Sequence, residues 1–503
     1  MTGAHHVSAR LLLERVAVLS PLTIMALIVS LFLSVYTLNM FVMAVLAAKT
    51  IVGHKQEMVK PHLSGKKLPA VTVQIPIYNE GVLVESVLEN VAGLAYPKSL
   101  LQIQVLDDST DHETLRKEKS LVTQYGDKGY DLQLVHRDTR KGFKAGALNN
   151  GLRTARGDYV AVVDADTWVP KNFLVETVSR FGQDDRLAFV QARCDYTDRW
   201  FNWITESNAI ARDVHFLVEQ PAKEWYDLLP NFSGKAGMWR RGVLDKYGWD
   251  ESVLTEDIEL SYRVQMGGWR SLYLQGITCQ IELPPSITAL RTQQRRWTAG
   301  FAQSLRKLWR PIMTSDKLTI GQKLETLLFL SSPLTHLGVL AAIALWILAA
   351  IFEPQATLGL WLETLSFSGF IAFISTAPHL AVLVAVLRCG EKRVRKLLTV
   401  PLMIVVVTGN LIANAKGAIE GLTKDNLVFE RTAKHGKKNL STRQHEVRTD
   451  YGLMRLMRKN RSEMFAAALG LSAAGIVLLQ GQATSAVPLS YLAAVWLVTS
   501  VRD

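Results

Sequence analysis

Cysteine is scarce in this chain of 503 residues, which contains only Cys194, Cys279 and Cys389. The three residues lie far apart in the sequence, so no pair has the spacing of zinc ligands and no even set suggests a disulfide framework. We therefore expect neither a zinc site nor a structural disulfide.

Charged residues are also few, at 20% of the chain, whereas hydrophobic residues make up 49%. This composition allows one large globular domain together with several membrane helices. Apolar runs that approach the roughly 20 residues needed to cross a bilayer lie at 16–48, 327–352, 366–387, 397–415, 464–480 and 485–501. The first run carries no charge and no small-residue cleavage site after a short apolar core, so we predict an uncleaved anchor and not a signal peptide.

The net charge of +12 could serve binding to nucleic acid or to an anionic membrane surface. Residues 416–461 contain twelve Lys or Arg and five Asp or Glu, and this basic segment adjoins two apolar runs. Basic segments beside membrane helices usually face anionic lipid on the cytoplasmic side. No nucleic-acid-binding motif accompanies the charge, so we expect the lipid bilayer as a partner and no nucleic acid.

Ordinary globular patterning is confined to residues 52–325. Short apolar runs bounded by turn residues predict strands at Val71–Ile77, Gln102–Leu106, Leu132–Val135, Tyr159–Val163 and Leu187–Gln191. Helical stretches lie between them; after Asn79, for example, apolar residues at 84, 87, 88 and 91 share one helix face. The alternation of strand and helix predicts an α/β fold with a mostly parallel sheet.

Polar residues follow three of these predicted strands. Tyr78, Asn79 and Glu80 follow the first, Asp107 and Asp108 the second, and Asp164 and Asp166 the fourth. Ligands of such folds bind beyond the carboxyl ends of the strands. We therefore expect the three strand ends to converge on one crevice.

The number of membrane crossings and the distribution of basic residues together predict the membrane topology. If the globular domain is cytoplasmic, the run at 327–352 leaves the cytoplasm and the run at 366–387 returns. A full crossing by 397–415 would then place the basic segment outside, against the positive-inside tendency. Because this run contains Pro401, Gly409, Asn410 and Asn414, we predict that it lies at the interface or re-enters, which leaves five crossings with the N-terminus outside. The alternative is a full crossing that violates the charge rule.

Asp164 and Asp166 are candidate metal ligands. They occupy alternate positions after a strand, so both side chains can point to the same side of the sheet edge. Mg²⁺ or Mn²⁺ held by one or two carboxylates completes its coordination with phosphate oxygens and water, which suits a nucleotide diphosphate leaving group. The alternative is a turn or a helix cap.

Three further segments contain candidate binding or catalytic residues, and each could instead have a purely structural role. Residues 140–149 combine cations with glycines, as a phosphate-binding loop or a solvated basic turn would. Glu256 and Asp257 precede a predicted helix, where Asp257 could accept the proton of a sugar hydroxyl or merely begin the helix. Gln293, Arg296 and Trp297 share one helix face, which fits a diphosphate and a sugar ring or an interfacial helix.

Taken in order, these motifs resemble those of the family 2 processive glycosyltransferases, which include cellulose, chitin and hyaluronan synthases. The resemblance spans roughly residues 68–310, and the stretch from Asn231 to Trp297 is most similar to the cellulose-synthase-like A group of mannan and glucomannan synthases. The motifs that carry it are Tyr78-Asn79-Glu80, Asp107-Asp108, Lys144-Ala145-Gly146, Asp164-Ala165-Asp166, Thr255-Glu256-Asp257 and Gln293-Gln294-Arg295-Arg296-Trp297.

This resemblance implies a Rossmann-like GT-A domain with a mostly parallel sheet, cytoplasmic and inserted between transmembrane helices. It implies that Tyr78, Glu80, Asp108, Lys144 and Asp164 bind the nucleotide sugar, with Asp164 and Asp166 as ligands of Mg²⁺ or Mn²⁺. Asp257, within the Glu256-Asp257 pair, would be the general base of an inverting displacement. The residues implied at the diphosphate and the acceptor are Gln293, Arg296, Trp297, Phe232 and Gly234.

One further match lies in the basic segment. Phe429, Thr432 and Lys434 fit the F-x-x-T-x-K gating loop of cellulose synthases, although Arg431 stands where the better-known version has valine. A mobile basic strip over a nucleotide diphosphate is physically sensible. The domains expected are an anchor at 1–51, the GT-A domain with interface helices at 52–325, transmembrane helices at 326–390, the re-entrant segment and gating-type loop at 391–463, and C-terminal transmembrane helices at 464–503.

These expectations describe a multi-pass membrane protein, in the inner membrane if bacterial, that adds hexosyl units from UDP- or GDP-sugar to a growing β-linked glycan and passes the product outward. The linkage implied by the resemblance is β-1,4, in a glucan, mannan or glucomannan. The alternative is a single-addition lipid glycosyltransferase similar to ceramide glucosyltransferase. A catalytically silent receptor or transporter would require the carboxylates to be incidental. Accessory secretion subunits and a homo-oligomer stay open as partners.

Overall fold

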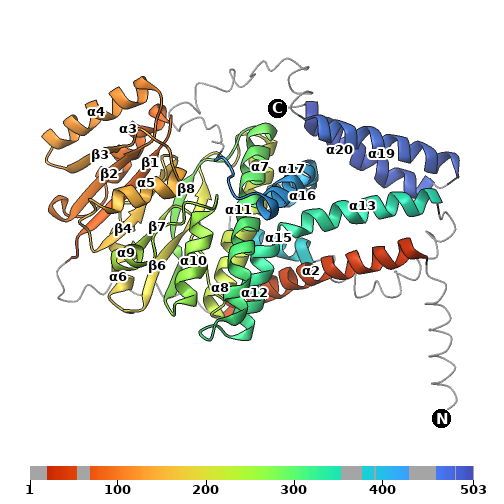
Figure 1. Cartoon of the computed structure of the whole chain (residues 1–503), viewed down its shortest axis with the longest axis horizontal. Coiled ribbons are helices and arrows are strands. Elements are labelled where there is room, and N and C mark those ends of the chain that lie inside the picture. The colour runs from red at the N-terminus through yellow and green to blue at the C-terminus, as the bar shows by residue number, and fades with distance from the viewer. Residues whose placement is uncertain are drawn as a thin grey trace, which may run out of the picture. The chain divides into compact units, whose positions relative to one another are not determined.

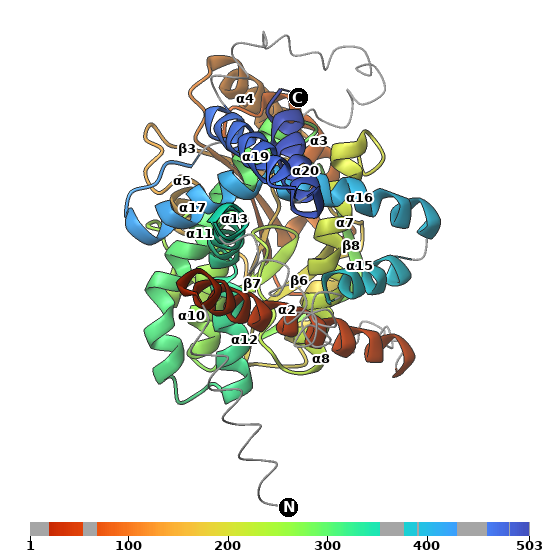
Figure 2. The ribbon, with the colours of Figure 1, turned by 90° about the vertical axis from the view of Figure 1, so that its right-hand side faces the viewer.

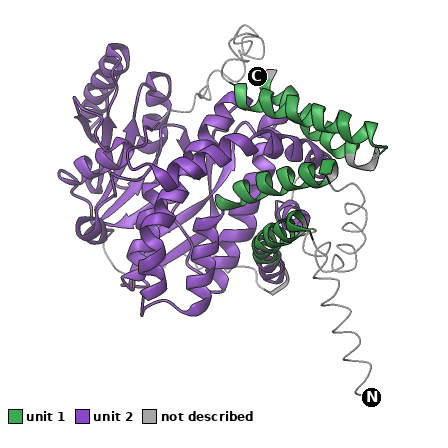
Figure 3. Cartoon of the chain, turned by 45° about the vertical axis from the view of Figure 1, so that its right-hand side comes forward, with its two compact units in different colours: residues 1–41, 334–378, 451–502 green, residues 42–333, 379–450, 503 purple. Residues whose placement is uncertain are grey.

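The computed structural model describes residues 20–53, 68–352, 377–389, 392–429, 460–481 and 483–501. The chain divides into two compact units (Figure 3). The first takes its residues from 1–41, 334–378 and 451–502, and the second from 42–333, 379–450 and 503. The second unit contains the globular α/β domain.

An eight-stranded sheet forms the centre of this domain, in the order β3-β2-β1-β4-β7-β6-β8-β5 (Figure 1). Strands β3, β2, β1 and β4 are parallel neighbours, β7 is antiparallel to both β4 and β6, and β8 is parallel to β6 and antiparallel to β5. The strands are β1 Val71–Ile77, β2 Leu101–Asp107, β3 Asp131–His136, β4 Tyr159–Val162, β5 Thr167–Trp168, β6 Leu187–Tyr196, β7 Gly237–Arg240 and β8 Arg270–Ile281. The predicted mostly parallel sheet is confirmed.

Helices cover both faces of the sheet because successive residues of a strand point to opposite faces. In β4, Val160 and Val162 enter one core with α5, α9 and α10, whereas Ala161 and the following Val163 enter the other with α3, α4 and α6. The helices of the domain are α3 Gly81–Ala92, η1 Lys98–Leu100, α4 His112–Asp127, α5 Phe143–Leu152, α6 Phe173–Phe181, α7 Trp203–Val214, η2 His215–Glu219, α8 Gln220–Trp225, α9 Arg241–Tyr247, α10 Glu256–Met266, α11 Ile287–Thr314 and α12 Ile320–Ser331.

The five strands predicted from apolar runs correspond to β1–β4 and β6, with ends shifted by a few residues. The sequence did not reveal β5, β7 or β8. Strand β7 has only four residues and includes Gly237 and Arg240, so its apolar signal is short. In β8, the pairing with β6 jumps from Leu274 to Thr278, and this bulge breaks the alternation that reveals a strand.

Several helices of the chain have the length and composition of membrane spans. Among the described residues, two helices are long and apolar enough to cross a bilayer, α2 Pro21–Gly53 over Ile24–Thr50 and α19 Arg461–Leu479. Up to four qualify if the bent pairs α12 with α13 and α16 with α17 are each one span. The other helices are α13 Leu334–Phe352, α15 Ala377–Arg388, α16 Arg393–Gly409, α17 Leu411–Thr423 and α20 Ala483–Val501. The run at 366–387 lies partly outside the described residues, and the five crossings stay a prediction.

The run at 397–415, which contains Pro401, is bent. Helices α16 and α17 meet at an angle of 45° around Asn410. Asn410 is fully buried at this break. Because a broken span and a re-entrant segment would both produce such a bend, the predicted interface position stays a prediction.

Helix α17 packs closely against α11, as Figures 1 and 2 both show. A β-carbon on Gly417 would lie 2.4 Å from the carbonyl oxygen of Arg295, and one on Gly421 would lie 2.1 Å from that of Ala299. The same interface holds a bidentate ion pair, in which Arg295 donates to Glu420 at 2.6 and 2.9 Å. Glycine therefore permits the two backbones to approach.

Substitution of Gly421 by alanine tests this packing. The new methyl group meets backbone atoms, so α17 must shift. We expect the free energy of unfolding to fall by about 1–3 kcal/mol, even though alanine is a better helix former than glycine by about 1 kcal/mol. Gly475→Ala is the matched control, since Gly475 lies inside α19 with nothing within 4 Å of an added β-carbon. Thermal unfolding should show a lower midpoint for Gly421→Ala alone; equal midpoints would contradict the close packing.

Candidate active site

The carboxyl ends of β1, β2 and β4 lie side by side at one edge of the sheet, because these strands are adjacent and parallel. Tyr78 and Asp108 follow β1 and β2 directly, and Asp164 lies two residues after the end of β4. The three strand ends therefore lie at one edge of the sheet, and their convergence on one crevice stays a prediction.

The loops after β1 and β2 are joined by hydrogen bonds. Asn79, in the left-handed region at φ 52°, donates its backbone N–H to Ser109 Oγ at 2.8 Å, and its side-chain oxygen accepts from the backbone N–H of Thr110 at 2.8 Å. Glu80 follows as the residue immediately before α3. The predicted nucleotide-binding residues Tyr78, Glu80 and Asp108 thus lie on two loops that are held together.

Asp108 is paired with an arginine that the sequence did not single out. Arg137, directly after β3, donates to both Asp108 carboxylate oxygens at 2.7 and 2.5 Å. It also donates to the carbonyl oxygens of Lys141 and Phe143, both at 2.9 Å. Arg137 therefore holds the turn formed by residues 137–143. Its position after a strand, like that of the acidic residues, was the signal that could have revealed it.

Aromatic rings and guanidinium groups meet above this loop. The Arg140 guanidinium lies 3.5 Å from the ring centroid of Tyr78, and its Nη1 donates to the carbonyl oxygen of Phe429 at 3.3 Å. The Arg296 guanidinium lies 3.9 Å from the ring centroid of Phe429. Phe429, the first residue of the predicted gating loop, therefore lies at the site. Thr432 and Lys434 are outside the described residues.

Lys144, in the first turn of α5, joins three parts of the site. Its Nζ donates to Asp164 Oδ1 at 2.6 Å and to the carbonyl oxygen of Gly234 at 2.7 Å. It lies 4.0 Å from Glu256 Oε1. Predicted residues from the loop after β4, from the loop before β7 and from α10 are therefore brought together around one ammonium group.

A second lysine, Lys235, was not predicted. Its Nζ lies 3.1 Å from Asp164 Oδ2 and 3.3 Å from Asp166 Oδ1. Asp166 is nearly fully buried, at 2% exposure, and Asp164 is half-buried. Lys235 is separated by more than 60 residues from the aspartates, so no local pattern pointed to it.

The two residues predicted at the acceptor, Phe232 and Gly234, lie in different surroundings. Gly234 has φ 77°, and a β-carbon on it would lie 2.8 Å from Asp257 Oδ2, so its missing side chain leaves room for the Asp257 carboxylate. The ring of Phe232 is fully buried and packs against Trp239 and Trp249. Phe232 supports the loop from the core instead of facing the carboxylates.

Glu256 and Asp257 begin α10, as predicted. Burial and the neighbouring Asp257 carboxylate raise the pKa of Glu256 to about 7, against the opposing effect of Lys144. Burial also raises the pKa of Asp257 above its ordinary value. A carboxylate with a raised pKa is a stronger base, which suits proton abstraction near neutral pH.

Helix α11 carries Gln293, Arg296 and Trp297. Burial lowers the pKa of Arg296 to about 10, although the carboxyl groups of Glu256, Asp164 and Asp257 act on it in the opposite direction. The aspartate after β4 and the tryptophan-bearing helix therefore contribute to one site. Trp297 is oriented by Arg212 of α7, whose guanidinium lies 4.8 Å from its ring. Gln293 is buried at 4% exposure.

The donor set at Asp164 and Asp166 fits a hard divalent cation. Within the described ranges no cluster of three or more His, Cys, Asp or Glu could hold a metal ion. Two carboxylates are nevertheless the usual protein contribution to a Mg²⁺ or Mn²⁺ ion that shares phosphate oxygens and water. The ammonium groups of Lys144 and Lys235 lie at these same oxygens, which shows that the position favours positive charge.

Comparison with known proteins agrees with this geometry. The pattern of the family described as "Glycosyltransferase like family 2" matches residues 69–300. Glucomannan 4-beta-mannosyltransferase 7 of Arabidopsis thaliana is 33% identical over 300 residues, 58% of this chain and 54% of that protein. Glucomannan 4-beta-mannosyltransferase 1 of Oryza sativa subsp. japonica is 32% identical over 308 residues, 60% of this chain and 59% of that protein. The chain thus spans little more than half the length of these two relatives.

A further relative is matched over more of its length. Probable glucomannan 4-beta-mannosyltransferase 11 of Arabidopsis thaliana is 30% identical over 306 residues, 59% of this chain and 69% of that protein. Among solved structures, the mannosyltransferase PcManGT from Pyrobaculum calidifontis, in complex with GDP-Man and Mn²⁺, aligns with 74% of this chain and 99% of its own at a TM-score of 0.53 and 22% identity, a likeness in fold alone. The chain belongs to glycosyltransferase family 2.

Proposed function

We propose that this chain is a metal-dependent, inverting glycosyltransferase that extends a β-1,4-linked glycan with mannosyl or glucosyl units from GDP- or UDP-sugar. The observation that carries the proposal is the meeting of Asp164, Lys144, Glu256, Asp257 and Arg296 in one site. They come from four separate segments of the chain. Such a cluster of acids and cations suits the departure of a nucleoside diphosphate.

In the proposed reaction, Asp257 accepts the proton of an acceptor hydroxyl group. The hydroxyl oxygen attacks the anomeric carbon of the donor sugar from the face opposite the diphosphate, and the bond between that carbon and the phosphate oxygen breaks. Asp257 suits this role because it is less buried than Glu256 and lies beside the open side of Gly234. One proton moves to Asp257, and the electron pair of the broken bond leaves with the nucleoside diphosphate.

Negative charge on the leaving group requires cations nearby. Lys144, Lys235 and Arg296 supply positive charge close to Asp164. Asp164 and Asp166 would hold Mg²⁺ or Mn²⁺, which as a Lewis acid would stabilise the departing diphosphate. Tyr78, Glu80 and Asp108 would bind the nucleoside, on the two loops joined through Asn79.

Three observations favour a membrane-bound polymerase. The relatives named above are glucomannan 4-β-mannosyltransferases. In the part of the chain that the structure describes, two helices are long and apolar enough to cross a bilayer, or up to four if each bent pair is one span. Phe429 lies against Arg296, where a loop over the nucleotide would close. We propose that the domain faces the cytoplasm, as the basic segment requires, and that the product passes outward through the membrane helices.

The test uses the full-length protein in lipid nanodiscs. It is incubated with labelled GDP-mannose or UDP-glucose and with Mn²⁺ or Mg²⁺, and the product is sized and digested with β-1,4-specific mannanase or glucanase. We expect a long chain that one of these hydrolases degrades. We expect GDP-mannose to be the preferred donor, because the relatives are named as mannosyltransferases.

A single labelled glycolipid would instead support the lipid glycosyltransferase described above as the alternative. Failure to transfer from either donor, in protein that still binds nucleotide, would refute the proposed activity. Product found inside sealed proteoliposomes whose catalytic domain faces outward would support passage through the membrane helices.

A further inference from the structure

A buried glutamate lies under the loops that follow β1 and β2. Glu118 of α4 and Asp107 at the end of β2 are both fully buried. In the part of the chain that the structure describes, no donor hydrogen-bonds either carboxyl oxygen of Glu118. Its neighbour within hydrogen-bonding reach is the carboxyl group of Asp107. Neither residue belongs to the set predicted to touch nucleotide or sugar.

Asp107 connects the ends of three strands. Its Oδ1 accepts the backbone N–H of Ser109 at 2.8 Å, and its Oδ2 lies 2.7 Å from Nδ1 of His136 at the end of β3. The Ser109 hydroxyl oxygen accepts the backbone N–H of Asn79 at 2.8 Å. The position of Asp107 therefore fixes the turn that bears Tyr78 and the loop that bears Asp108.

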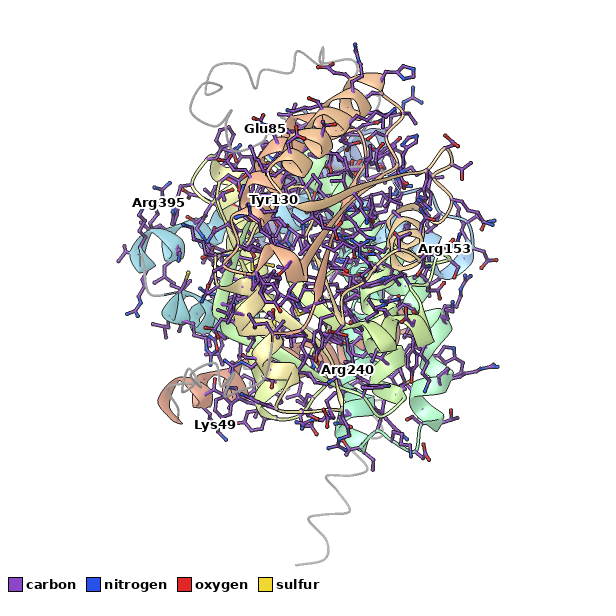
Figure 4. All side chains as sticks on the ribbon, turned by 90° about the vertical axis from the view of Figure 1, so that its left-hand side faces the viewer. Lys49, Glu85, Tyr130, Arg153, Arg240 and Arg395 are labelled. Atoms are coloured by element: carbon purple, nitrogen blue, oxygen red, sulfur yellow. The ribbon has the colours of Figure 1, made fainter. Side chains whose placement is uncertain are left out.

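Two ionised carboxylates cannot hydrogen-bond each other because both only accept, so this contact requires a proton. The other charged groups around Glu118 do not remove the requirement for a proton between Glu118 and Asp107. Asp111, before α4, adds further negative charge, and burial together with Asp107 raises the pKa of Glu118 to about 9. Between α3 and α4, Lys117 pairs with Glu85 at 3.6 Å, and both side chains are exposed to solvent (Glu85 is labelled in Figure 4). On the far side, His136 Nε2 lies 3.7 Å from the exposed Asp138.

We propose that Glu118 is a positioning residue, which carries a proton at neutral pH and donates it to Asp107 in a hydrogen bond that holds the two nucleotide-binding loops in place. The role in nucleotide binding rests on the proposed function; the protonated state of Glu118 does not. Glu118 acts through Asp107, Ser109 and Asn79, without touching the nucleotide.

The experiment compares wild type, Glu118→Gln and Glu118→Ala as full-length protein. Calorimetry measures the Kd of GDP and of UDP with Mn²⁺ between pH 7 and pH 10. In wild type, loss of the Glu118 proton should raise the Kd by about three- to tenfold toward pH 10, the worth of one hydrogen bond. Glutamine keeps a donor and cannot ionise, so this part of the rise should be absent. Alanine lacks the donor and should bind weakly at every pH.

All other titrating groups, including those of the nucleotide and of Mn²⁺-bound water, are common to wild type and Glu118→Gln, so the difference between their profiles isolates Glu118. Identical profiles would overturn the inference, as would wild-type affinity in Glu118→Ala. If wild type binds neither nucleotide at pH 7, the proposed function fails together with the positioning role.

Unfolding tests the proton independently of any nucleotide. Because the pKa of Glu118 is about 9 in the fold and 4.5 as its ordinary value, folding takes up a proton between these pH values. Wild type should therefore lose stability relative to Glu118→Gln as pH rises from 5 to 9, and the gap should then level off. A gap in unfolding midpoint that does not change with pH would contradict a protonated Glu118, even if nucleotide binds.

Discussion

Replacing Asp257 with asparagine is expected to lower the turnover of glycosyl transfer by about 10²- to 10⁴-fold, the usual contribution of a general base. Asparagine has nearly the same shape as aspartate but cannot accept a proton from the acceptor hydroxyl. Nucleotide affinity should remain, because Lys144, Arg296 and the aspartates after β4 are unchanged. Transfer of labelled sugar and calorimetric binding of GDP with Mn²⁺ measure the two effects separately.

The matched control is Asp245→Asn. Asp245 lies on α9, its side chain is half exposed and it pairs with Arg241 at 3.4 Å, away from the site. This variant should transfer sugar at the wild-type rate. Turnover by Asp257→Asn within about tenfold of wild type would reject the base assignment, since even a weak general base contributes more. Glu256 would then be the next candidate.

Glu256 and Asp257 also predict a pH dependence. The base must be ionised to accept a proton, and both pKa values are raised by burial, with Glu256 at about 7. Activity should therefore fall as pH drops through the range in which the pair takes up protons. Because the two carboxyl groups interact, the apparent pKa of the acidic limb belongs to the pair.

The strands and helix starts that position the site residues were predicted well from the sequence, because they depend on local patterns. Parallel strands leave clear apolar runs, and polar residues such as Asp108 and Asp164 directly follow them. Helix starts are equally local, so Glu256 and Asp257 were placed correctly at the beginning of α10. Adjacency of β1, β2 and β4 then brought these residues to one edge of the sheet.

The residues that sequence reasoning missed are those whose partners are distant. Lys235 meets Asp164 only because β7 inserts antiparallel beside β4, and β7 itself was not predicted. Arg137 resembled any basic loop residue until its bidentate pair with Asp108 was visible. The ring of Phe232 was assigned to the site from resemblance, yet its neighbours Trp239 and Trp249 place the ring in the core.

Arg296 illustrates how packing between helices can support the chemistry. It follows Arg295, whose ion pair with Glu420 joins α11 to α17. Helix α17 leads to Phe429, which lies under the Arg296 guanidinium. The Gly417 and Gly421 contacts therefore position both partners of the Arg296–Phe429 pair, and a shift of α17 would separate them.

Replacing Asp166 with asparagine is expected to weaken Mn²⁺-dependent binding of GDP by about 10²-fold and to lower transfer at least as much, because a metal ion contributes several kcal/mol to holding and stabilising phosphate charge. Substitution of Asp166 is a more specific test of the metal site than substitution of Asp164. Asp164 also pairs with Lys144 at 2.6 Å and with Lys235 at 3.1 Å, so its loss would disturb both lysines. Asp316→Asn, at a side chain 87% exposed, is the matched control.

Chelation separates the metal from the rest of the site. With EDTA in place of Mn²⁺, wild type and Asp166→Asn should bind GDP with the same residual affinity, because Lys144, Arg296 and the loops after β1 and β2 are common to both. With Mn²⁺ restored, only wild type should regain tight binding. Equal affinities in Mn²⁺ would remove Asp166 from the metal site, whereas unequal affinities in EDTA would mean that Asp166 acts on the phosphates through the fold, by way of Lys235, and not through a cation.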